Sequence, residues 1–256
     1  KTDYLMAIVQ RTDPKFLRSF SAPMDSVMNG LLAVHPKDSL TLELAGLWYY
    51  SSGRNDKAAV CFKKNVQEHP ASLSASAGLV EFLMYAQMWD ELAQEGRKAF
   101  ETFPSEPSFL EMASIGDYNM ERYDEVLAIC DKVLEVAPAD SSRTLRAWST
   151  KGDIYYRLGD SKKAYKAYDK ALKVNPDYVY VLNNYAYYLS EEGKQLKKAY
   201  AMSKKAIEQE PDNATYLDTF GWIVHLLGRP MEAKPFFKKA MLYGGKDSAV
   251  IMDHYA

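Results

Sequence analysis

The 256-residue sequence has no long apolar run and very few cysteines. No stretch of 18 apolar residues occurs, so no membrane-spanning helix is predicted within it. The two cysteines, Cys61 and Cys130, belong to no CxxC pair and have no metal-ligand spacing. The hydrophobic fraction of 47% and the charged fraction of 26% are those of an ordinary water-soluble protein with a large core.

Short motifs of the common catalytic and nucleotide-binding sites are also missing. No GxGxxG, GxxxxGK, GxSxG or HExxH string occurs. The four histidines are scattered, and His35 and His69 each precede a proline at an expected helix end, where a cation is favoured. Neighbouring carboxylates such as Asp90 and Glu91 are interpreted as helix caps rather than as an acid–base pair. We therefore expect no catalytic residue, no metal site, no cofactor and no enzyme activity in this chain.

What the sequence does contain is a periodic series of prolines. Successive members are separated by 34, 34, 34, 38 and 35 residues, in the order Pro36, Pro70, Pro104, Pro138, Pro176 and Pro211. A proline ring cannot continue a helix, so each proline is expected to end a helical unit. Such a period is typical of a repeat protein, in which each unit buries its apolar face against its neighbours.

The clearest unit, Leu145–Pro176, is predicted to form two helices joined by a tight turn. In each helix three residues recur at spacings of four and three, so that they share one face. They are Trp148, Gly152 and Tyr155 in the first helix and Ala164, Tyr168 and Ala171 in the second. Gly159 suits the left-handed conformation that ends a helix. The small residues allow the two helices to approach closely, and the aromatic side chains fill the space around that contact.

This order of Trp, Gly, Tyr, Ala, aromatic, Ala and Pro resembles the tetratricopeptide repeat (TPR), a 34-residue helix–turn–helix. Lys151 departs from the pattern, because the family usually has leucine there, and we expect it to weaken one packing position. The resemblance implies an all-α fold: a right-handed superhelix, or α-α solenoid, with first helices on the concave face and second helices outside. The later units resemble those of bacterial TPR proteins, many of which are cell-envelope lipoproteins.

The whole chain, residues 1–256, is expected to be one TPR solenoid of about seven helix pairs and one extra C-terminal helix. Repeats over residues 1–140 are degenerate; the first has helices at residues 4–9 and 23–34, with an irregular link around Pro14 and Pro23. Repeats over residues 145–245 follow the consensus, and residues 248–256 begin a partial repeat. Four additional polar residues around Asp140–Arg143 are expected to lengthen a turn.

The two cysteines are expected to stay unpaired. Cys61 and Cys130 fall on second helices two repeats apart. Stacked helix pairs are on the order of 10 Å apart, so the thiols should be roughly 20 Å apart. That separation exceeds the Cα distance of about 7 Å that a disulfide allows.

Charge is unevenly distributed although the net charge is only −2. Residues 1–140 hold 13 basic and 21 acidic residues, a balance of −8, whereas residues 141–256 hold 19 and 13, a balance of +6. Nucleic-acid binding by the basic half is therefore one alternative, which a steep salt dependence would favour. We favour a solvated outer face, because five lysines interleave with the apolar stripe of one second helix: Lys162, Lys163, Lys166, Lys170 and Lys173.

Aromatic and polar residues form a candidate binding surface on the first helices, away from the repeat core. The candidate protein-binding residues are Arg146, Ser149, Asp153, Tyr180, Asn183, Asn184, Tyr187, Asp218, Trp222 and His225. Such side chains suit an extended segment or an amphipathic helix. The alternative for Tyr187 and Trp222 is packing between neighbouring helices. The carboxylate clamp of one TPR subclass is not predicted, because only Asn184 matches it.

The sequence therefore favours a non-catalytic scaffold that binds another protein or peptide in the concave groove of a TPR superhelix. The alternative is an accessory TPR module of a larger enzyme or envelope machine whose activity lies outside this chain. We expect no nucleic-acid partner and no direct membrane insertion; a lipid anchor would lie outside this chain. The resemblance favours a periplasmic or cell-envelope location, with the cytoplasm as the alternative.

The C-terminal edge is expected to take part in contacts. Residues 248–256 begin a repeat whose second helix is absent, so the apolar residues Val250, Ile251 and Tyr255 lack cover on one side. We expect either an oligomer contact through this edge or continuation of the natural chain.

Overall fold

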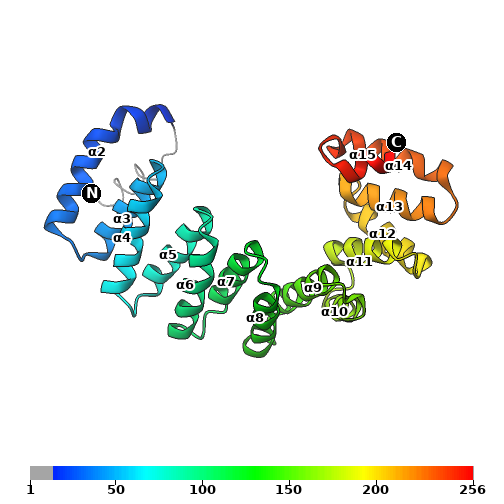
Figure 1. The fold of residues 1–256 in the computed structure, drawn as a ribbon, viewed down its shortest axis with the longest axis horizontal. Coiled ribbons are helices and arrows are strands. Elements are labelled where there is room, and N and C mark those ends of the chain that lie inside the picture. The colour runs from blue at the N-terminus through cyan, green and yellow to red at the C-terminus, as the bar shows by residue number, and fades with distance from the viewer. Residues whose placement is uncertain (1–13, 256) are drawn as a thin grey trace. The chain divides into compact units, whose positions relative to one another are not determined.

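The computed structural model describes residues 14–255, with side chains from residue 19 onward, and this part of the chain is helical throughout (Figure 1). It contains fourteen α-helices, one short 3-10 helix and no strand within the described range. The all-α repeat fold is thereby confirmed. The helix expected at residues 4–9 lies outside the described residues.

The helices follow one another as antiparallel hairpins with short turns. Their bounds are α2 (Pro14–Val34), α3 (Ser39–Ser51), α4 (Asn55–Glu68), α5 (Leu73–Tyr85), α6 (Trp89–Thr102), α7 (Ser108–Asn119), α8 (Tyr123–Val136), α9 (Ser141–Arg157), α10 (Ser161–Val174), α11 (Val179–Glu191), α12 (Leu196–Gln209), α13 (Ala214–Leu226), α14 (Pro230–Leu242), η1 (Gly245–Asp247) and α15 (Ala249–Tyr255). The odd-numbered helices from α3 on are the first helices of their repeats, and the even-numbered ones are the second helices.

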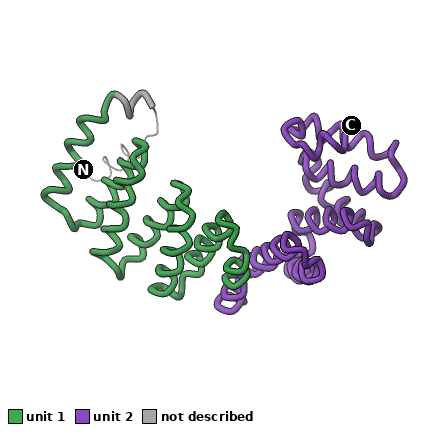
Figure 2. Tube along the Cα trace, viewed as in Figure 1, with its two compact units in different colours: residues 1–129 green, residues 130–256 purple. Residues whose placement is uncertain are grey.

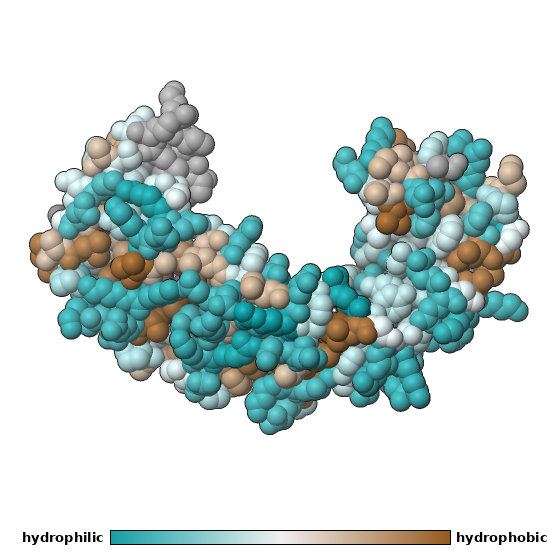
Figure 3. Space-filling view, viewed as in Figure 1, coloured by the Kyte–Doolittle hydropathy of each residue, from teal (hydrophilic) through white to brown (hydrophobic). Residues whose placement is uncertain are grey.

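The chain divides into two compact units, residues 1–129 and residues 130–256, with the division inside α8 (Figure 2). Within each unit, first and second helices pack together, and neighbouring repeats contact one another. Hydrophilic residues cover most of the surface that is visible in the space-filling view of either unit (Figure 3). The expectation that the two units form one continuous solenoid stays a prediction.

Local sequence explains where the helices begin. Side-chain oxygens of Asp38, Asp140 and Asp160 accept the backbone N–H three residues later, at 2.8, 2.9 and 3.0 Å respectively. Each satisfies one of the backbone donors that a helix N-terminus leaves without an intrahelical partner. The turn inside each repeat contains at least one residue with positive φ, such as Gly159 at 80°, and the turn between α11 and α12 contains two, Gly193 and Gln195. The expected capping and turn roles of Asp160 and Gly159 are thus confirmed.

The four additional residues near Asp140 lengthen a helix, and the expectation of a longer turn is wrong. Asp140 still caps the helix, at the same offset from its proline as in other repeats. The helix then runs for 17 residues in α9, against 13 in α11 and in α13. The added residues contain no proline or glycine, so nothing interrupts the hydrogen bonds that begin at the cap.

The expected irregular link around Pro23 is also wrong. Pro14 is the first residue of α2, and Pro23 lies inside this single 21-residue helix. A proline at the first position loses no hydrogen bond, whereas an interior proline costs about 3 kcal/mol. Tertiary contacts of the following turn offset this cost: Met24 and Met28 are buried, and Asp25 accepts a hydrogen bond of 2.7 Å from the Trp48 indole.

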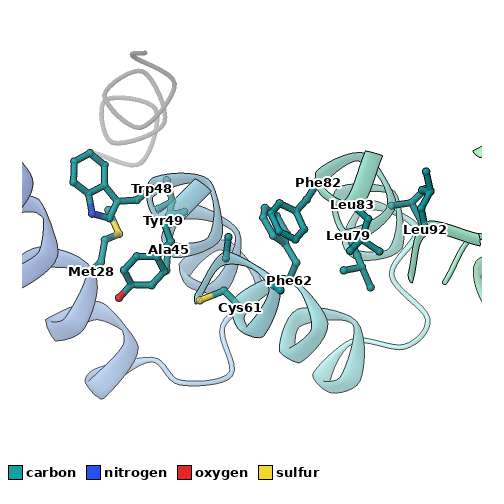
Figure 4. Close-up of a cluster of buried hydrophobic side chains, with 14 of the residues drawn as sticks. Met28, Ala45, Trp48, Tyr49, Cys61, Phe62, Leu79, Phe82, Leu83 and Leu92 are labelled. Atoms are coloured by element: carbon teal, nitrogen blue, oxygen red, sulfur yellow. The ribbon is translucent and has the colours of Figure 1, made fainter. Parts of the chain in front are cut away.

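The core of unit 1 is a row of apolar side chains that passes from one repeat to the next (Figure 4). Phe62 of α4 stacks on Phe82 of α5 with ring centroids 4.9 Å apart. A Cβ atom on Gly46 would lie 2.8 Å from the Phe62 ring, so only glycine admits this ring there. Gly152 of unit 2 meets the Tyr168 ring in the same way, which confirms the close helix approach that the sequence predicts.

Lys151 does not simply weaken its packing position. Its side chain is buried, and Nζ lies 2.5 Å from the Asp131 carboxylate of α8. The ammonium also lies 5.6 Å from the centre of the Trp148 ring. A carboxylate from the preceding helix α8 and an aromatic face one turn earlier in α9 therefore accommodate a charge where the family pattern has leucine.

The partial repeat forms the short helix α15, as predicted. Val250 and Tyr255 are about half exposed, at 49% and 47%. Ile251 differs from the expectation, because it is only 5% exposed and packs against Leu217 and Ala240. Oligomerisation through this edge stays a prediction.

Both cysteines are free and buried, in line with the expected absence of a bridge. Burial raises the pKa of both thiols, that of Cys130 to about 12. None of the described helices has the length and apolar character needed to cross a membrane.

Candidate protein-binding surface

The ten residues that the sequence singles out lie on three neighbouring helices of unit 2. Helix α11 contacts both α9 and α13, and α13 contacts α15. We call the face of α9, α11 and α13 that carries these ten residues the first-helix surface. The structure thus places the candidate residues of three consecutive repeats next to one another, as their register predicts.

The ten side chains differ in exposure. Arg146, Tyr180 and His225 are exposed, whereas Ser149, Asn183 and Asp218 are buried, with exposed fractions of 4%, 2% and 4%. The other four, Asp153, Asn184, Tyr187 and Trp222, are half-buried. A partner would therefore contact the exposed and half-buried members, and the three buried ones would support them from below.

Asp153 is the centre of a hydrogen-bond cluster that joins α9, α10 and α11. Its Oδ1 accepts hydrogen bonds from the Tyr168 hydroxyl and from Asn184 Nδ2, the latter at 3.2 Å. Its Oδ2 accepts one from the Tyr180 hydroxyl at 2.8 Å. Burial raises the pKa of Asp153, and the hydrogen bonds from the two tyrosines and Asn184 act in the opposite direction. The cluster holds Tyr180 and Asn184 of α11 against Asp153 of α9.

A second cluster surrounds Trp222. Its indole stacks between two imidazoles, with ring-centroid distances of 5.4 Å to His225 and 4.3 Å to His254. His254 Nδ1 lies 2.9 Å from Asp218 Oδ2. The hydrogen bond to Asp218 raises the pKa of His254, against the effect of burial. The buried acid therefore holds the histidine of α15 over the tryptophan of α13.

Two tyrosines that the sequence interpretation missed connect the repeats. Tyr156 of α9 stacks on Tyr188 of α11, with ring centroids 3.6 Å apart and an interplanar angle of 16°. Tyr187 lies beside this pair, with its ring centroid 5.7 Å from that of Tyr188. Tyr156 follows Asp153 by three residues, and this helical spacing was the signal that could have found it.

His254 was also missed, since the four histidines were interpreted as unrelated. In the register of the repeat, Tyr255 corresponds to Phe220. His254 therefore corresponds to Thr219, the residue that follows Asp218. The contact itself spans 36 residues and depends on how the partial repeat packs. Register therefore placed the residue near this surface, and packing decided its partner.

The first-helix surface combines aromatic and polar side chains. It offers aromatic faces from three repeats and the exposed Tyr180, whose ring lies over a network that is already hydrogen-bonded. The Trp222 indole nitrogen is buried and has no hydrogen-bond partner among the described residues. Over residues 14–255 no group of three or more His, Cys, Asp or Glu side chains is placed to hold a metal ion.

Comparison with protein families finds two matches, both to models described as "Tetratricopeptide repeat", over residues 145–178 and 167–200. Among curated proteins, "TPR repeat-containing protein MJ1428" of Methanocaldococcus jannaschii is 24% identical over 155 residues, which cover 57% of this chain and 26% of the relative. "Superkiller protein 3" of Schizosaccharomyces pombe is 24% identical over 186 residues, which cover 70% and 13%. The chain thus spans about a quarter or less of these relatives.

Solved structures of similar fold include PilF of Pseudomonas aeruginosa, with a TM-score of 0.63, 18% identity and coverage of 84% of this chain and 95% of that one. PilW, titled a "widely conserved type IV pilus biogenesis factor", has a TM-score of 0.62, 18% identity and coverage of 85% and 98%. YrrB, titled "a TPR protein with an unusual peptide-binding site", has a TM-score of 0.56, 18% identity and coverage of 77% and 98%. At these identities the likeness shows the fold alone.

Proposed function

Because the chain is a tetratricopeptide-repeat protein, we propose that it is a non-catalytic scaffold that binds another protein or a peptide through the first-helix surface of unit 2. The observation that carries the proposal is the gathering of half-buried aromatic rings from three consecutive repeats on one surface. Tyr156, Tyr187 and Trp222 each leave part of a ring uncovered.

Aromatic anchors of this kind dominate the energetics of many protein interfaces. They bury a large area while losing little conformational freedom, and truncating one to alanine often costs 2 kcal/mol or more. The Asp153 cluster and the Asp218–His254 contact hold the surrounding side chains before binding. A preordered surface loses less entropy on association, so a modest contact area can still give useful affinity.

The accessory-module alternative has its own support. The chain spans about a quarter or less of the curated relatives that it matches. One structural neighbour, PilW, is titled a "widely conserved type IV pilus biogenesis factor". In this form of the proposal, the chain holds a client for a larger assembly in the cell envelope, and the first-helix surface keeps the same role.

The test uses a peptide selected on the intact chain from a phage-displayed library. Its affinity is then measured by fluorescence polarisation for Tyr187→Ala combined with Trp222→Ala. Loss of one anchor of about 2 kcal/mol weakens binding about thirtyfold, so loss of both should weaken it by up to about a thousandfold. The matched control is Tyr85→Ala with Tyr118→Ala, two aromatic residues of consecutive first helices in unit 1, which should leave the affinity unchanged.

Thermal melting followed by circular dichroism separates binding from packing. The double variant should melt only slightly below the unaltered chain, because both rings are half-buried on the surface. Unchanged peptide affinity would exclude this surface. A collapse in melting temperature would instead assign both residues to the core.

A further inference from the structure

The second helices of unit 2 concentrate positive charge. Helices α10, α12 and α14 together carry twelve lysines, no arginine and three carboxylates, a balance of +9. The corresponding helices α4 and α6 of unit 1 carry five basic and six acidic residues, a balance of −1. The same structural position is therefore nearly neutral in one unit and strongly basic in the other. Solubility alone does not require this difference, since the mixed charges of unit 1 also suit a solvated face.

Most of this charge is uncompensated. Four of the twelve lysines form ion pairs, among them Lys198 with Asp169 and Lys205 with Asp177, at 3.3 and 2.9 Å. The other eight have no ion pair within residues 14–255. Lys166, Lys173 and Lys238 are examples, and all three side chains are exposed.

The three helices present their charges on one side of unit 2. The Lys198–Asp169 pair connects α12 to α10. The guanidinium of Arg229, at the start of α14, lies 5.8 Å from the centre of the Tyr200 ring of α12. The lysines are distributed over three helices, so they form a broad field of charge rather than a single cluster. We call this face of α10, α12 and α14 the outer-helix surface.

Helix α14 adds two exposed apolar side chains to the field. Met231 and Leu242 are 80% and 75% exposed, the highest fractions of any large hydrophobic residue in the described part of the chain. Met231, Lys238 and Leu242 are seven and four residues apart, so they share one stripe of the helix. Binding to an anionic membrane surface strengthens with buried apolar area as well as with positive charge, and these two side chains supply apolar area beside the lysines.

We propose that the outer-helix surface of unit 2 docks on an anionic lipid bilayer, with its lysines among the headgroups and Met231 and Leu242 in the interfacial layer. Lysine acts as a compact point charge that a diffuse anionic surface attracts without defined geometry. Nucleic-acid recognition uses arginine and stacking aromatic rings. Within the bounds of these three helices there is no arginine and no exposed aromatic side chain. Only Arg229 and Tyr243 flank α14, and Arg229 forms an ion pair with Glu232. The composition therefore favours lipid over nucleic acid.

The outer-helix surface and the first-helix surface share no helix, since one is formed by α10, α12 and α14 and the other by α9, α11 and α13. The proposal is thus independent of the proposed protein-binding function. It describes attachment to a membrane surface, with no segment crossing the bilayer.

The test is sedimentation of the full chain with vesicles of phosphatidylcholine alone or mixed with phosphatidylserine. We expect binding only to the mixed vesicles, and an affinity that falls as salt is added, because salt screens exposed charges. Each lysine near an anionic surface strengthens binding about fivefold. Lys166→Glu, Lys173→Glu and Lys238→Glu combined should then weaken binding roughly a hundredfold or more.

The matched control makes the same change in net charge on unit 1, with Lys57→Glu, Lys63→Glu and Lys98→Glu. It should alter vesicle binding only slightly if the outer-helix surface is the site. Met231→Ser with Leu242→Ser should weaken binding without changing its dependence on salt. Circular dichroism checks that each variant is folded, and the affinity for the selected peptide should be unchanged in all of them.

Three results would overturn the proposal: no binding to the mixed vesicles, equal binding to both kinds of vesicle, or equal losses in the two charge-reversal variants. Tighter binding to a mixed-sequence oligonucleotide than to the vesicles would assign the surface to nucleic acid instead. Loss of peptide binding with intact vesicle binding would reject only the protein-binding function.

Discussion

The two units build the same helix hairpin with different residues at its turn. In unit 2 every hairpin turn has a glycine with positive φ, at Gly159, Gly193 and Gly228. In unit 1 only the first turn does, at Gly53, whereas Gln87 and Glu121 take this conformation in the next two turns. Left-handed backbone costs a residue with a Cβ roughly 1–2 kcal/mol. Two hairpins of unit 1 therefore form against their local preference, and packing between the helices has to supply the difference.

The units also differ in how they keep a carboxylate inside. In unit 1, Asp117 of α7 is fully buried and forms an ion pair with Arg97 of α6, while Arg122 lies 3.8 Å away. In unit 2, hydroxyl and amide donors surround Asp153 instead. Burial raises the pKa of both acids. An ion pair thus holds the buried Asp117 of unit 1, whereas neutral hydrogen bonds hold Asp153 of unit 2.

Removing the charge partner in unit 1 should have the largest effect. Arg97→Ala leaves the Asp117 carboxylate buried beside only the more distant Arg122, so we expect a loss of about 3 kcal/mol in the free energy of unfolding. Urea unfolding followed by circular dichroism measures it. Adding Asp117→Asn to Arg97→Ala should restore much of the stability, because no buried charge remains.

The matched change in unit 2 is Asp153→Asn. It keeps a hydrogen-bonding group among neutral partners and should cost no more than about 1 kcal/mol. Equal losses for Arg97→Ala and Asp153→Asn would contradict the distinction between the two units.

Exchanging the turn residues should have an intermediate effect of opposite sign in the two units. Glu121→Gly removes the strain of a left-handed residue and should stabilise the chain by about 0.5–1 kcal/mol. Gly159→Glu introduces the same strain in unit 2 and should destabilise it by about 1 kcal/mol. Thermal melting of both variants provides the comparison. Glu121→Gly would count against this explanation if it lowered the melting temperature.

The smallest expected effect is a pH dependence that belongs to unit 2. The pKa of His254 is raised in the folded chain by its hydrogen bond to Asp218. The contact therefore contributes its full stability below the ordinary histidine pKa of about 6.5 and loses it as pH rises through the folded value. Amide hydrogen exchange should show weaker protection of α15 at about pH 8 than at about pH 6.

His254→Gln should remove this difference between the two pH values. The control is His69→Gln, whose exposed ring contacts the Lys37 carbonyl oxygen in unit 1, and it should leave the protection of α15 unchanged. Protection of α15 that is independent of pH in the unaltered chain would show that the His254 contact does not hold this helix.

Prediction from sequence succeeded where the signal was local and repeated. The proline period located the units, and Gly159 with Asp160 located a turn because backbone conformation and capping depend on adjacent residues. Prediction failed at Pro23 and at the residues after Asp140. At Pro23 a proline was expected to interrupt the helix, and after Asp140 an insertion was expected to lengthen a turn. The helix continues in both places.

For the first-helix surface, too, the local and repeated signals were predictable and the packing was not. Helical register alone placed its ten residues on neighbouring first helices, since the period of the repeat fixes which positions share a face. Their role in binding stays a prediction. Which of them are covered depended on packing, because Ser149, Asn183 and Asp218 are buried by neighbouring helices.

The sequence by itself thus determined the helix hairpins, their turns and the side of each helix that carries charge, because these follow from interactions within one repeat. Only the tertiary structure decided the partners between repeats: Lys151 with Asp131, Tyr156 with Tyr188 and His254 with Asp218. Those contacts depend on the distance and rotation between stacked hairpins, which a period in the sequence does not specify.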